Sequence, residues 1–474
     1  MLVLKFGGTS VANAQNIKLV AEIVQQKKDL QKTVVVVSAC SGVTDQLVLL
    51  THLVSDKNKE YKIKFSNLKE QHDTVIQELD LVHDEKLQKV IHKHFKHLET
   101  LLEGCFLLGD VQPKIYDAII GFGELLSSTI ISSFFAQKFD IENPFVDSRS
   151  LIVTDENFGN ANVFYPETYQ HVEDYFQNSE KSLFVLPGFI ASSRNGSTTT
   201  LGRGGSDYTA AIVANGVSAD SLEIWTDVSG MYAANPKIVK QAQPIASISY
   251  QEAMELSHFG AKVLYPPTIQ PALKKQIPIW IKNTFAPNEN GTLISNENAT
   301  PQQSVKGISN IDKIALLTLE GGGMVGVSGI AKKLFETLSL HNINVIFITQ
   351  ASSEHSICIG ILENQAEKAK KYIDEVFHKE ITHGQLNACQ LEKDLSIIAL
   401  VGDQMKNHQG LSGKMFSTLG RNNVNVRAIA QGASERNISA VINSKDVVKA
   451  LNALHEVFFE TVTKQLNLFV VGTG

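Results

Sequence analysis

Apolar residues in the first 300 positions alternate between short continuous runs and stretches with helical spacing. Leu2–Phe6 is an apolar run that ends at two glycines, and Thr33–Val37 is a run of β-branched residues. The segment between them carries apolar residues on one helical face, at Ile17, Val20, Ile23 and Val24. Continuous β-branched runs are typical of strands buried on both faces of a parallel sheet. The pattern predicts an α/β domain whose mainly parallel sheet is covered by helices on both sides.

The same alternation continues toward residue 281. Apolar runs precede Gly121, Pro187 and Asp227, and Ile277–Ile281 is another. We expect strand, glycine-rich turn and helix to repeat along this part, with ligand sites beyond the carboxyl ends of the strands. A stretch rich in lysine, glutamate and histidine interrupts the pattern at residues 56–97 and predicts a helical hairpin on the surface.

A long repeat occupies the C-terminal part of the chain. HNINVIFITQ, ending at Gln350, is matched by RNNVNVRAIAQ, ending at Gln431, and these glutamines lie 81 residues apart. Ser353 and Ser434 correspond at the same spacing. A repeat of this length predicts a duplicated module of about 75 residues rather than a solenoid. Duplicated modules at the end of a metabolic protein are often sensors, so we expect a regulatory role.

Composition narrows the class of protein. Hydrophobic residues make up 43% and charged residues 19% of the 474 positions, which is ordinary for a globular protein. A net charge of −6 gives no general attraction to nucleic acid or to an anionic membrane. Four scattered cysteines without CxxC spacing favour a reducing compartment over a disulfide framework or a zinc site. No signal segment opens the chain, and no apolar run approaches the roughly 20 residues of a membrane helix. We therefore expect a cytoplasmic protein without nucleic-acid or membrane partners.

Two glycine-rich turns offer anion sites. Lys5 to Ser10, KFGGTS, places paired glycines and a lysine at a strand–helix junction, where N–H groups can meet an anion. A tight turn explains these glycines equally well. Leu201–Asp207, LGRGGSD, combines a backbone nest with an arginine fork suited to a carboxylate or phosphate, and we favour a binding loop over a merely flexible one.

Two further segments carry polar residues near strand ends. Trp225–Tyr232, WTDVSGMY, with Lys237 beyond it, suits an adenine nucleotide, although a DVSG turn needs no ligand. Glu124 follows an apolar run and opens a helix, where it could face an ammonium group or cap the helix. Histidines at positions 92, 94 and 97 do not predict a metal site, because residues two apart on a helix point in different directions and Lys93 and Lys96 would repel a cation, so we assign no residue as a metal ligand.

Five ordered motifs carry a family resemblance: KFGGTS, GFGE, GRGGSD, EIWTDVSGMY and FGAKVLYP. Together they resemble the aspartokinases of the amino-acid kinase superfamily, most of all the kinase portion of bifunctional aspartokinase/homoserine dehydrogenases. The resemblance implies an amino-acid-kinase-like sheet sandwiched by helices over residues 1–295, with the helical insertion at 56–105. A linker over 296–310 and two ferredoxin-like α+β ACT domains over 311–390 and 391–465 follow. The ending, NLFVVGTG, resembles the start of a dinucleotide-binding fold, so residues 466–474 are interpreted as the beginning of a truncated dehydrogenase domain, either in a fragment of a bifunctional enzyme or in a monofunctional descendant of one.

The resemblance also implies roles for individual residues. The catalytic residues are Lys5 and Asp207. ATP phosphates are held by Lys5, Gly7, Gly8 and Ser10, and the rest of the nucleotide site comprises Thr226, Asp227, Tyr232, Lys237 and Lys262. L-aspartate is bound by Ser38, Thr44, Glu124, Phe189, Arg203 and Ser206, with Glu124 facing the ammonium group and Arg203 a carboxylate. Two positions depart from the family pattern: Asn235 replaces an acid, and Tyr265 replaces a histidine.

The implied reaction is ATP plus L-aspartate giving 4-phospho-L-aspartate and ADP, the entry to lysine, threonine and methionine synthesis. The β-carboxylate of aspartate has an ordinary pKa of about 3.9, so it is ionised at neutral pH and needs no general base. Lysines, backbone N–H groups and Mg²⁺ would position two anions and stabilise the transferring phosphoryl group. The alternatives are a kinase for glutamate or N-acetylglutamate, and a non-catalytic amino-acid sensor with a degenerate kinase domain.

Regulation is expected in the repeats. An amide both donates to a carboxylate or hydroxyl and accepts from an ammonium group, so Gln350 and Gln431 suit a small amino acid. We predict an allosteric site at these glutamines with Ser353 and Ser434, for threonine first and lysine second, in a homodimer or tetramer formed through ACT domains. The alternative is that both glutamines only form hydrogen bonds with backbone groups at the strand ends.

Overall fold

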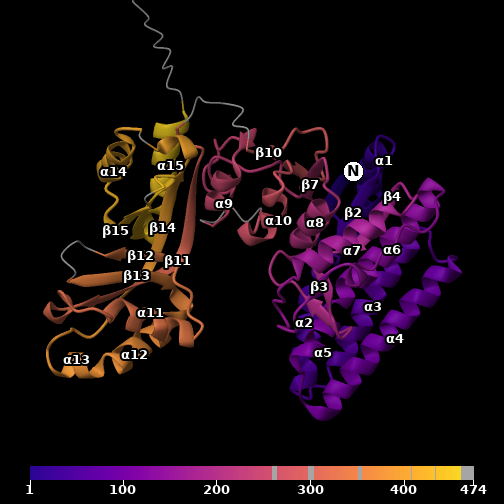
Figure 1. Cartoon of the computed structure of the whole chain (residues 1–474), viewed down its shortest axis with the longest axis horizontal. Helices are drawn as coiled ribbons and strands as arrows, with labels where there is room; N and C mark the ends of the chain where they lie inside the picture. Colours follow the sequence, from indigo (N-terminus) through magenta and orange to yellow (C-terminus); the bar gives the residue numbers. More distant parts are fainter. Residues whose placement is uncertain (259–263, 297–303, 351–354, 407, 433, 461–474) are drawn as a thin grey trace, which may run out of the picture. The chain divides into compact units, whose positions relative to one another are not determined.

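The computed structural model describes residues 1–258, 264–296, 304–350, 355–406, 408–432 and 434–460 (Figure 1). It divides into two compact units. The first comprises residues 1–231 and 244–258 together with the described residues from 264 to 296. The second comprises residues 232–243 and the described residues from 304 onward. The predicted nucleotide residues Tyr232 and Lys237 thus fall in the second unit.

A seven-stranded sheet organises the first unit. Its order is β4-β2-β1-β7-β9-β10-β8, and the strands from β4 to β9 are parallel while β10 is antiparallel to β9. The strands are β4 (Leu183–Pro187), β2 (Thr33–Val37), β1 (Leu2–Phe6), β7 (Ser221–Thr226), β9 (Ile279–Asn283), β10 (Thr292–Ile294) and β8 (Ser247–Ile248). The predicted mainly parallel sheet is confirmed. The carboxyl ends of β4, β2, β1 and β7 meet at one edge, where β1 lies between strands that come from different parts of the chain.

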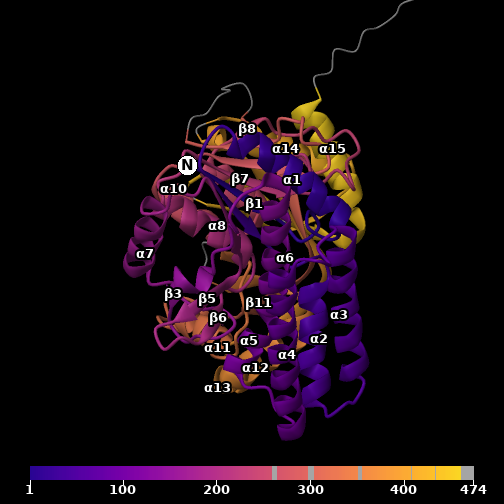
Figure 2. The same cartoon turned by 90° about the vertical axis from the view of Figure 1, so that its right-hand side faces the viewer.

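Helices cover both faces of this sheet. Leu2, Leu4 and Phe6 of β1 point into one core with α1 (Ala14–Lys28), α2 (Val43–Ser55) and α6 (Phe122–Phe139). Alternate strand residues face opposite sides, and α8 (Gly205–Gly216) packs on β1 and β7 from the other side (Figure 2). The unit also contains the helices α7 (Tyr165–Gln177), α9 (Tyr250–His258) and α10 (Gln270–Lys274).

The predicted helical hairpin is formed by α3 (Tyr61–Glu78) and α4 (Glu85–Leu108). Asp84 begins α4 by accepting hydrogen bonds from the N–H groups of Lys86 and Leu87. The hairpin is more deeply buried than we expected, because Phe95 and Leu98 of α4 lie in the same hydrophobic core as β1. Charged residues occupy only its outer faces.

The expectation of a strand before Gly121 is wrong. This apolar run is the helix α5 (Pro113–Ile120), which begins at a proline suited to the first helical turn. The expectation that no apolar stretch is long enough to cross a membrane is also wrong by length alone. Helices α5 and α6, joined through Gly121, together span 27 residues, Pro113–Phe139, of sufficient length and hydropathy, but 89% of the most apolar window is buried inside the protein. Such burial is typical of a core helix.

A small sheet lies beside the main one. Its order is β3-β5-β6, with β3 (Val153–Thr154) parallel to β5 (Ile190–Ser193) and β6 (Thr198–Thr200) antiparallel to it. β5 starts three residues after β4 ends, and β6 ends directly before the LGRGGSD motif. The small sheet therefore delivers the glycine–arginine loop to the edge of the main sheet.

The second unit confirms the sequence repeat in three dimensions. Its first copy is β11 (Gly307–Glu320), α11 (Ile330–Leu340), β12 (Phe347–Gln350), β13 (Ser356–Leu362) and α12 (Ala366–Val376), followed by α13 (His378–Thr382). Its second copy is β14 (Gln390–Val401), α14 (Leu411–Arg421), β15 (Val426–Gln431), β16 (Asn437–Asn443) and α15 (Val447–Phe459). Even backbone details repeat, since Lys313 and Asp394 have φ of 58° at equivalent positions.

The two copies share one six-stranded sheet of order β12-β13-β11-β14-β16-β15. The first half of β11 pairs with the second half of β14, and Ile308 is buried in one cluster with Leu400. β11 therefore begins at Gly307, inside the predicted linker 296–310, because it completes the second copy before it enters the first. Ala234 and Val239 pack into that same cluster, which explains why residues 232–243 belong to this unit.

Candidate active site

A cavity of about 740 Å³ opens at the edge where the parallel strands of the first unit end. Lys5 comes from the end of β1, Ser38 follows β2, Phe189 follows β4, and Asp227 follows β7. The helices α2, α6 and α8 close the cavity with their first turns. The predicted site residues that line it are Lys5, Gly7, Gly8, Ser38, Thr44, Glu124, Phe189, Arg203, Ser206, Asp207, Thr226 and Asp227.

Lys5 and Asp207 form an ion pair in the wall of this cavity. The Lys5 Nζ lies 2.7 Å from Asp207 Oδ1, and both side chains are less than one-sixth exposed. Asp207 stands in the first turn of α8, where the helix dipole favours a carboxylate. Gly8 packs closely on the turn after β2, because a Cβ there would lie 3.0 Å from the Ala39 carbonyl oxygen, whereas a Cβ on Gly7 would lie at an ordinary 3.5 Å from the Lys5 Nζ. The ammonium group of Lys5 is thus held in place by a carboxylate.

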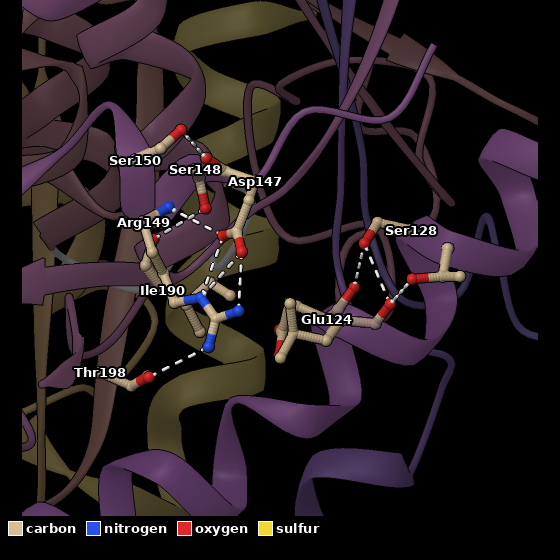
Figure 3. Close-up of polar contacts among 10 residues, drawn as sticks. Glu124, Ser128, Asp147, Ser148, Arg149, Ser150, Ile190 and Thr198 are labelled. Atoms are coloured by element: carbon tan, nitrogen blue, oxygen red, sulfur yellow. Dashed lines mark hydrogen bonds and ion pairs between the residues drawn. The ribbon is translucent and has the colours of Figure 1, made fainter. Parts of the chain in front are cut away.

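Glu124 is a buried carboxyl at the start of α6. Burial raises its pKa to about 8, opposed by the backbone N–H groups of Ala39 and Glu124 and by the charge of Lys5. Its Oε2 has no hydrogen-bond partner within the described residues. Figure 3 shows Ser128 donating from its hydroxyl to the Glu124 carbonyl, at 2.6 Å. The Ser127 hydroxyl donates to the Ser38 carbonyl at 2.8 Å, so α6 is fastened to the end of β2. A fixed, incompletely paired carboxyl facing a cavity is suited to receive an ammonium group.

The glycine–arginine loop forms another part of the cavity wall. The backbone turns through Gly204, whose φ of 70° suits glycine, and a Cβ on Gly205 would lie 2.6 Å from the Phe189 ring. The Arg203 guanidinium carbon lies 5.6 Å from the centre of the Tyr265 ring, a cation–π contact. Tyr265, which departs from the family motif, is therefore the resting contact of the arginine.

Some predicted residues lie elsewhere. Ser10 is fully buried, and its hydroxyl lies 2.7 Å from that of Thr284, so it braces the glycine turn rather than lining the cavity. Tyr232 and Lys237 belong to the second unit, and their contact with a nucleotide stays a prediction. Lys262 lies outside the described residues.

The predicted allosteric residues lie in the second unit at the ends of its edge strands. Gln350 ends β12 and Gln431 ends β15, and both side chains are exposed. β12 and β15 also lie close to one another in this unit. Ser434 is exposed beyond β15, and Ser353 lies outside the described residues. Their role in binding an amino acid stays a prediction.

Several residues of the site escaped sequence reasoning. Asp45, Tyr116, Gly159 and Thr200 also line the cavity. The SACSG segment after β2 carried a signal, because a polar turn at a strand end precedes Asp45, whereas Gly159 and Thr200 have none in their local sequence. The nearby strand β6 is held by Arg149, which donates to Thr198 at 3.2 Å while paired with Asp147 (Figure 3).

Comparison with known proteins identifies the architecture. Residues 1–283 match the amino acid kinase family, and residues 317–377 and 398–458 each match the ACT domain. The chain is 35% identical over 479 residues to the chloroplastic bifunctional aspartokinase/homoserine dehydrogenase 1 of Arabidopsis thaliana, covering 99% of this chain and 52% of that protein. It is 30% identical to the lysine-sensitive aspartokinase 3 of Escherichia coli, covering 97% of this chain and 99% of that one. The chain thus spans about half the length of its bifunctional relatives.

Comparison with solved structures points to the same family. E. coli aspartokinase III in complex with aspartate and ADP superposes with a TM-score of 0.82 at 28% identity, covering 97% of this chain and all of that one. The same enzyme with lysine and aspartate gives a TM-score of 0.79 at 29% identity. Kinase motifs, paired repeats and whole-chain likeness coincide, and the chain therefore belongs to the aspartokinases, the phosphotransferases of the amino acid kinase family that carry ACT domains.

Proposed function

We propose that this chain transfers the γ-phosphoryl group of ATP to the β-carboxylate of L-aspartate. The observation that carries the proposal is the convergence of Lys5, Glu124 and Arg203 on one cavity at the ends of parallel strands. A cationic group for phosphate, a carboxyl for an ammonium group and a guanidinium for a carboxylate are the groups that this reaction needs. The E. coli relative bound to aspartate and ADP supports the same assignment.

The geometry suggests how the residues divide the work. Arg203 and Glu124 would hold the α-carboxylate and the α-ammonium group of aspartate, so that its β-carboxylate is free to point toward Lys5. Lys5, kept in place by Asp207 at 2.7 Å, would neutralise charge on the transferring phosphoryl group. The N–H groups beside Gly7 and Gly8 would donate to the nucleotide phosphates. No residue needs to remove a proton, because the nucleophile is already ionised.

Mg²⁺ fits this scheme as the companion of the nucleotide. The described residues contain no group of three or more histidines, cysteines, aspartates or glutamates able to hold a metal. Mg²⁺ usually binds through one or two carboxylates together with substrate phosphates and water. Asp207 and Asp227 offer carboxylates in the cavity wall, and we propose that they hold the ion when the nucleotide is bound. Mg²⁺ would supply charge neutralisation.

Substrate choice tests this proposal. ADP release from ATP and Mg²⁺ is measured with L-aspartate, L-glutamate and N-acetylglutamate, each at several concentrations. We expect turnover with aspartate alone, since Glu124 and Arg203 would hold the α-carbon, and the added methylene of the longer substrates would displace the side-chain carboxylate from its place beside Lys5. Preference for either longer substrate would favour another amino-acid kinase, and absence of turnover with all three would favour a sensor without catalysis.

We further propose that an amino acid regulates the enzyme through the second unit. The exposed Gln350 and Gln431 end equivalent strands of the two ACT domains and offer amides to a small ligand. Threonine is our first candidate, and the lysine-sensitive E. coli relative supports lysine as the second. Titrating activity with threonine, lysine and methionine distinguishes the effectors.

We also propose that the chain forms a homodimer or tetramer through the ACT domains. We propose a cytoplasmic location, although the plant relatives are chloroplastic.

A further inference from the structure

Asp117 is a buried carboxylate that the proposed chemistry does not use. It lies on α5 with no exposed surface. Its Oδ2 accepts hydrogen bonds from the backbone N–H groups of Gly159, at 3.0 Å, and Thr200, at 2.8 Å. These donors are 41 residues apart in the chain, so a single oxygen joins two separate segments to the helix.

Both segments form the wall of the cavity. Gly159 and Thr200 line it directly, and so do Tyr116 and Ile120, the neighbours of Asp117 on α5. The Ala161 N–H also donates to the Thr200 carbonyl at 3.0 Å, which fastens the two segments to each other. Asp117 therefore stands behind the wall at the point where three of its elements meet.

Arg203 follows this junction by three residues. Gly202 has φ of 69°, and a Cβ there would lie 2.5 Å from Asn160 Oδ1, so the two segments are in close contact beside the arginine. The Leu201 N–H donates to the Phe189 carbonyl at 2.9 Å, which continues the connection to the turn between β4 and β5. A shift at Thr200 would move the base of the arginine loop.

Burying the Asp117 carboxylate costs desolvation free energy. Burial raises the pKa of Asp117, while the N–H groups of Gly159 and Thr200 and the Thr200 hydroxyl favour its charged form. Its Oδ1 lacks a hydrogen-bond partner in the described part of the chain. A carboxylate is kept behind a polar wall where a packed apolar side chain would avoid desolvation.

We propose that Asp117 is a positioning residue that holds the Gly159 and Thr200 segments and thereby fixes Arg203 for its substrate carboxylate. The inference rests on the proposed function, since it assigns Arg203 to the amino-acid substrate. We expect its effect on aspartate rather than on ATP, because Arg203 is the residue that we assign to the amino-acid substrate.

Three variants test the proposal in the full chain. D117A removes the acceptor, D117N keeps one oxygen for both N–H groups, and D117E keeps the charge but adds a methylene. D73A removes an exposed carboxylate from α3 as the matched control. Steady-state kinetics give KM for aspartate, KM for ATP and kcat, and thermal unfolding reports folding. The wild type is assayed first, because a wild type without aspartate-dependent turnover overturns the proposed function rather than this inference.

We expect D117A to raise KM for aspartate about tenfold or more while KM for ATP changes less than about twofold. D117N should keep KM for aspartate within about threefold of the wild type, and D73A should not change it. D117E should raise KM for aspartate severalfold. If D117A does not fold, the KM of D117E tests the positioning role in its place. A purely structural residue would lower Tm and the active fraction with both KM values unchanged, and that result in D117A or D117E overturns the inference.

Discussion

The buried carboxyl of Glu124 predicts that aspartate use depends on pH near neutrality. Its pKa is raised from the ordinary 4.5 to about 8 by burial. At about 1.4 kcal/mol for each pH unit, this difference makes the charged form about 5 kcal/mol less favourable than in water. Roughly one Glu124 in ten is then ionised at pH 7. Only the ionised form attracts the ammonium group of aspartate fully.

The assay is kcat/KM for aspartate between pH 6 and 9, at saturating ATP and Mg²⁺. This ratio reports pKa values of the free enzyme. We expect it to rise by nearly tenfold per pH unit at the acid end and to level off near pH 8. E124Q cannot ionise, so its kcat/KM should be low and should lack this rise. A wild-type profile that is flat from pH 6 to 8 would refute the assignment of Glu124 to the ammonium group.

The raised pKa of Glu124 also predicts how the free energy of unfolding changes with pH. Between pH 4.5 and about 8 the folded state keeps a proton on Glu124 that the unfolded state has lost. Its stabilising contribution is therefore full below about pH 4.5 and is lost as pH rises toward 8, by up to about 1.4 kcal/mol per unit. Urea unfolding of the wild type should show this trend relative to E124Q. An equal pH dependence in both proteins would mean that Glu124 is ionised in the folded state.

Substitutions at four other positions test the remaining roles. Lys5→Ala should lower kcat by about 10²–10³-fold, because a preorganised charge is lost beside Asp207, and near-normal kcat would remove it from catalysis. Arg203→Ala should raise KM for aspartate far more than KM for ATP, and Arg203→Lys should rescue poorly because it lacks the planar fork; a selective loss of ATP affinity would reverse that assignment. Gln350→Ala and Gln431→Ala should each weaken threonine inhibition with basal activity kept, since a coupling of about 1–3 kcal/mol is enough for regulation. An unchanged threonine response in both variants, measured as the inhibitor concentration at half activity, would contradict the proposed effector site.

Much of the cavity was predictable because parallel strands deliver their carboxyl ends to one edge. Lys5, Ser38 and Asp227 each follow or end an apolar run, so their convergence follows from the strand pattern alone. The repeat spacing likewise predicted the second unit, since 81 residues separate Lys313 from Asp394 as they separate the glutamines. These features depend on local sequence or on regular periodicity.

Other features depend on contacts between distant segments. The apolar run of α5 is as short as a strand, and periodicity could not separate the two over eight residues. Asp117 has no motif, because its partners are backbone N–H groups 42 and 83 residues away. Residues 232–243 belong to the second unit because Ala234 and Val239 pack against the second ACT repeat. No local sequence pattern predicts this packing.

The most direct test of the central claim is detection of the product itself. ³¹P NMR follows the chain with ATP, Mg²⁺ and L-aspartate, and hydroxylamine is added afterwards to trap acyl phosphate. We predict that an acyl-phosphate signal appears together with ADP, that hydroxylamine removes it, and that it is strongly reduced for Lys5→Ala. ADP and inorganic phosphate without an acyl-phosphate signal or a trapped hydroxamate, or a signal unchanged in Lys5→Ala, would contradict phosphoryl transfer to aspartate in this cavity.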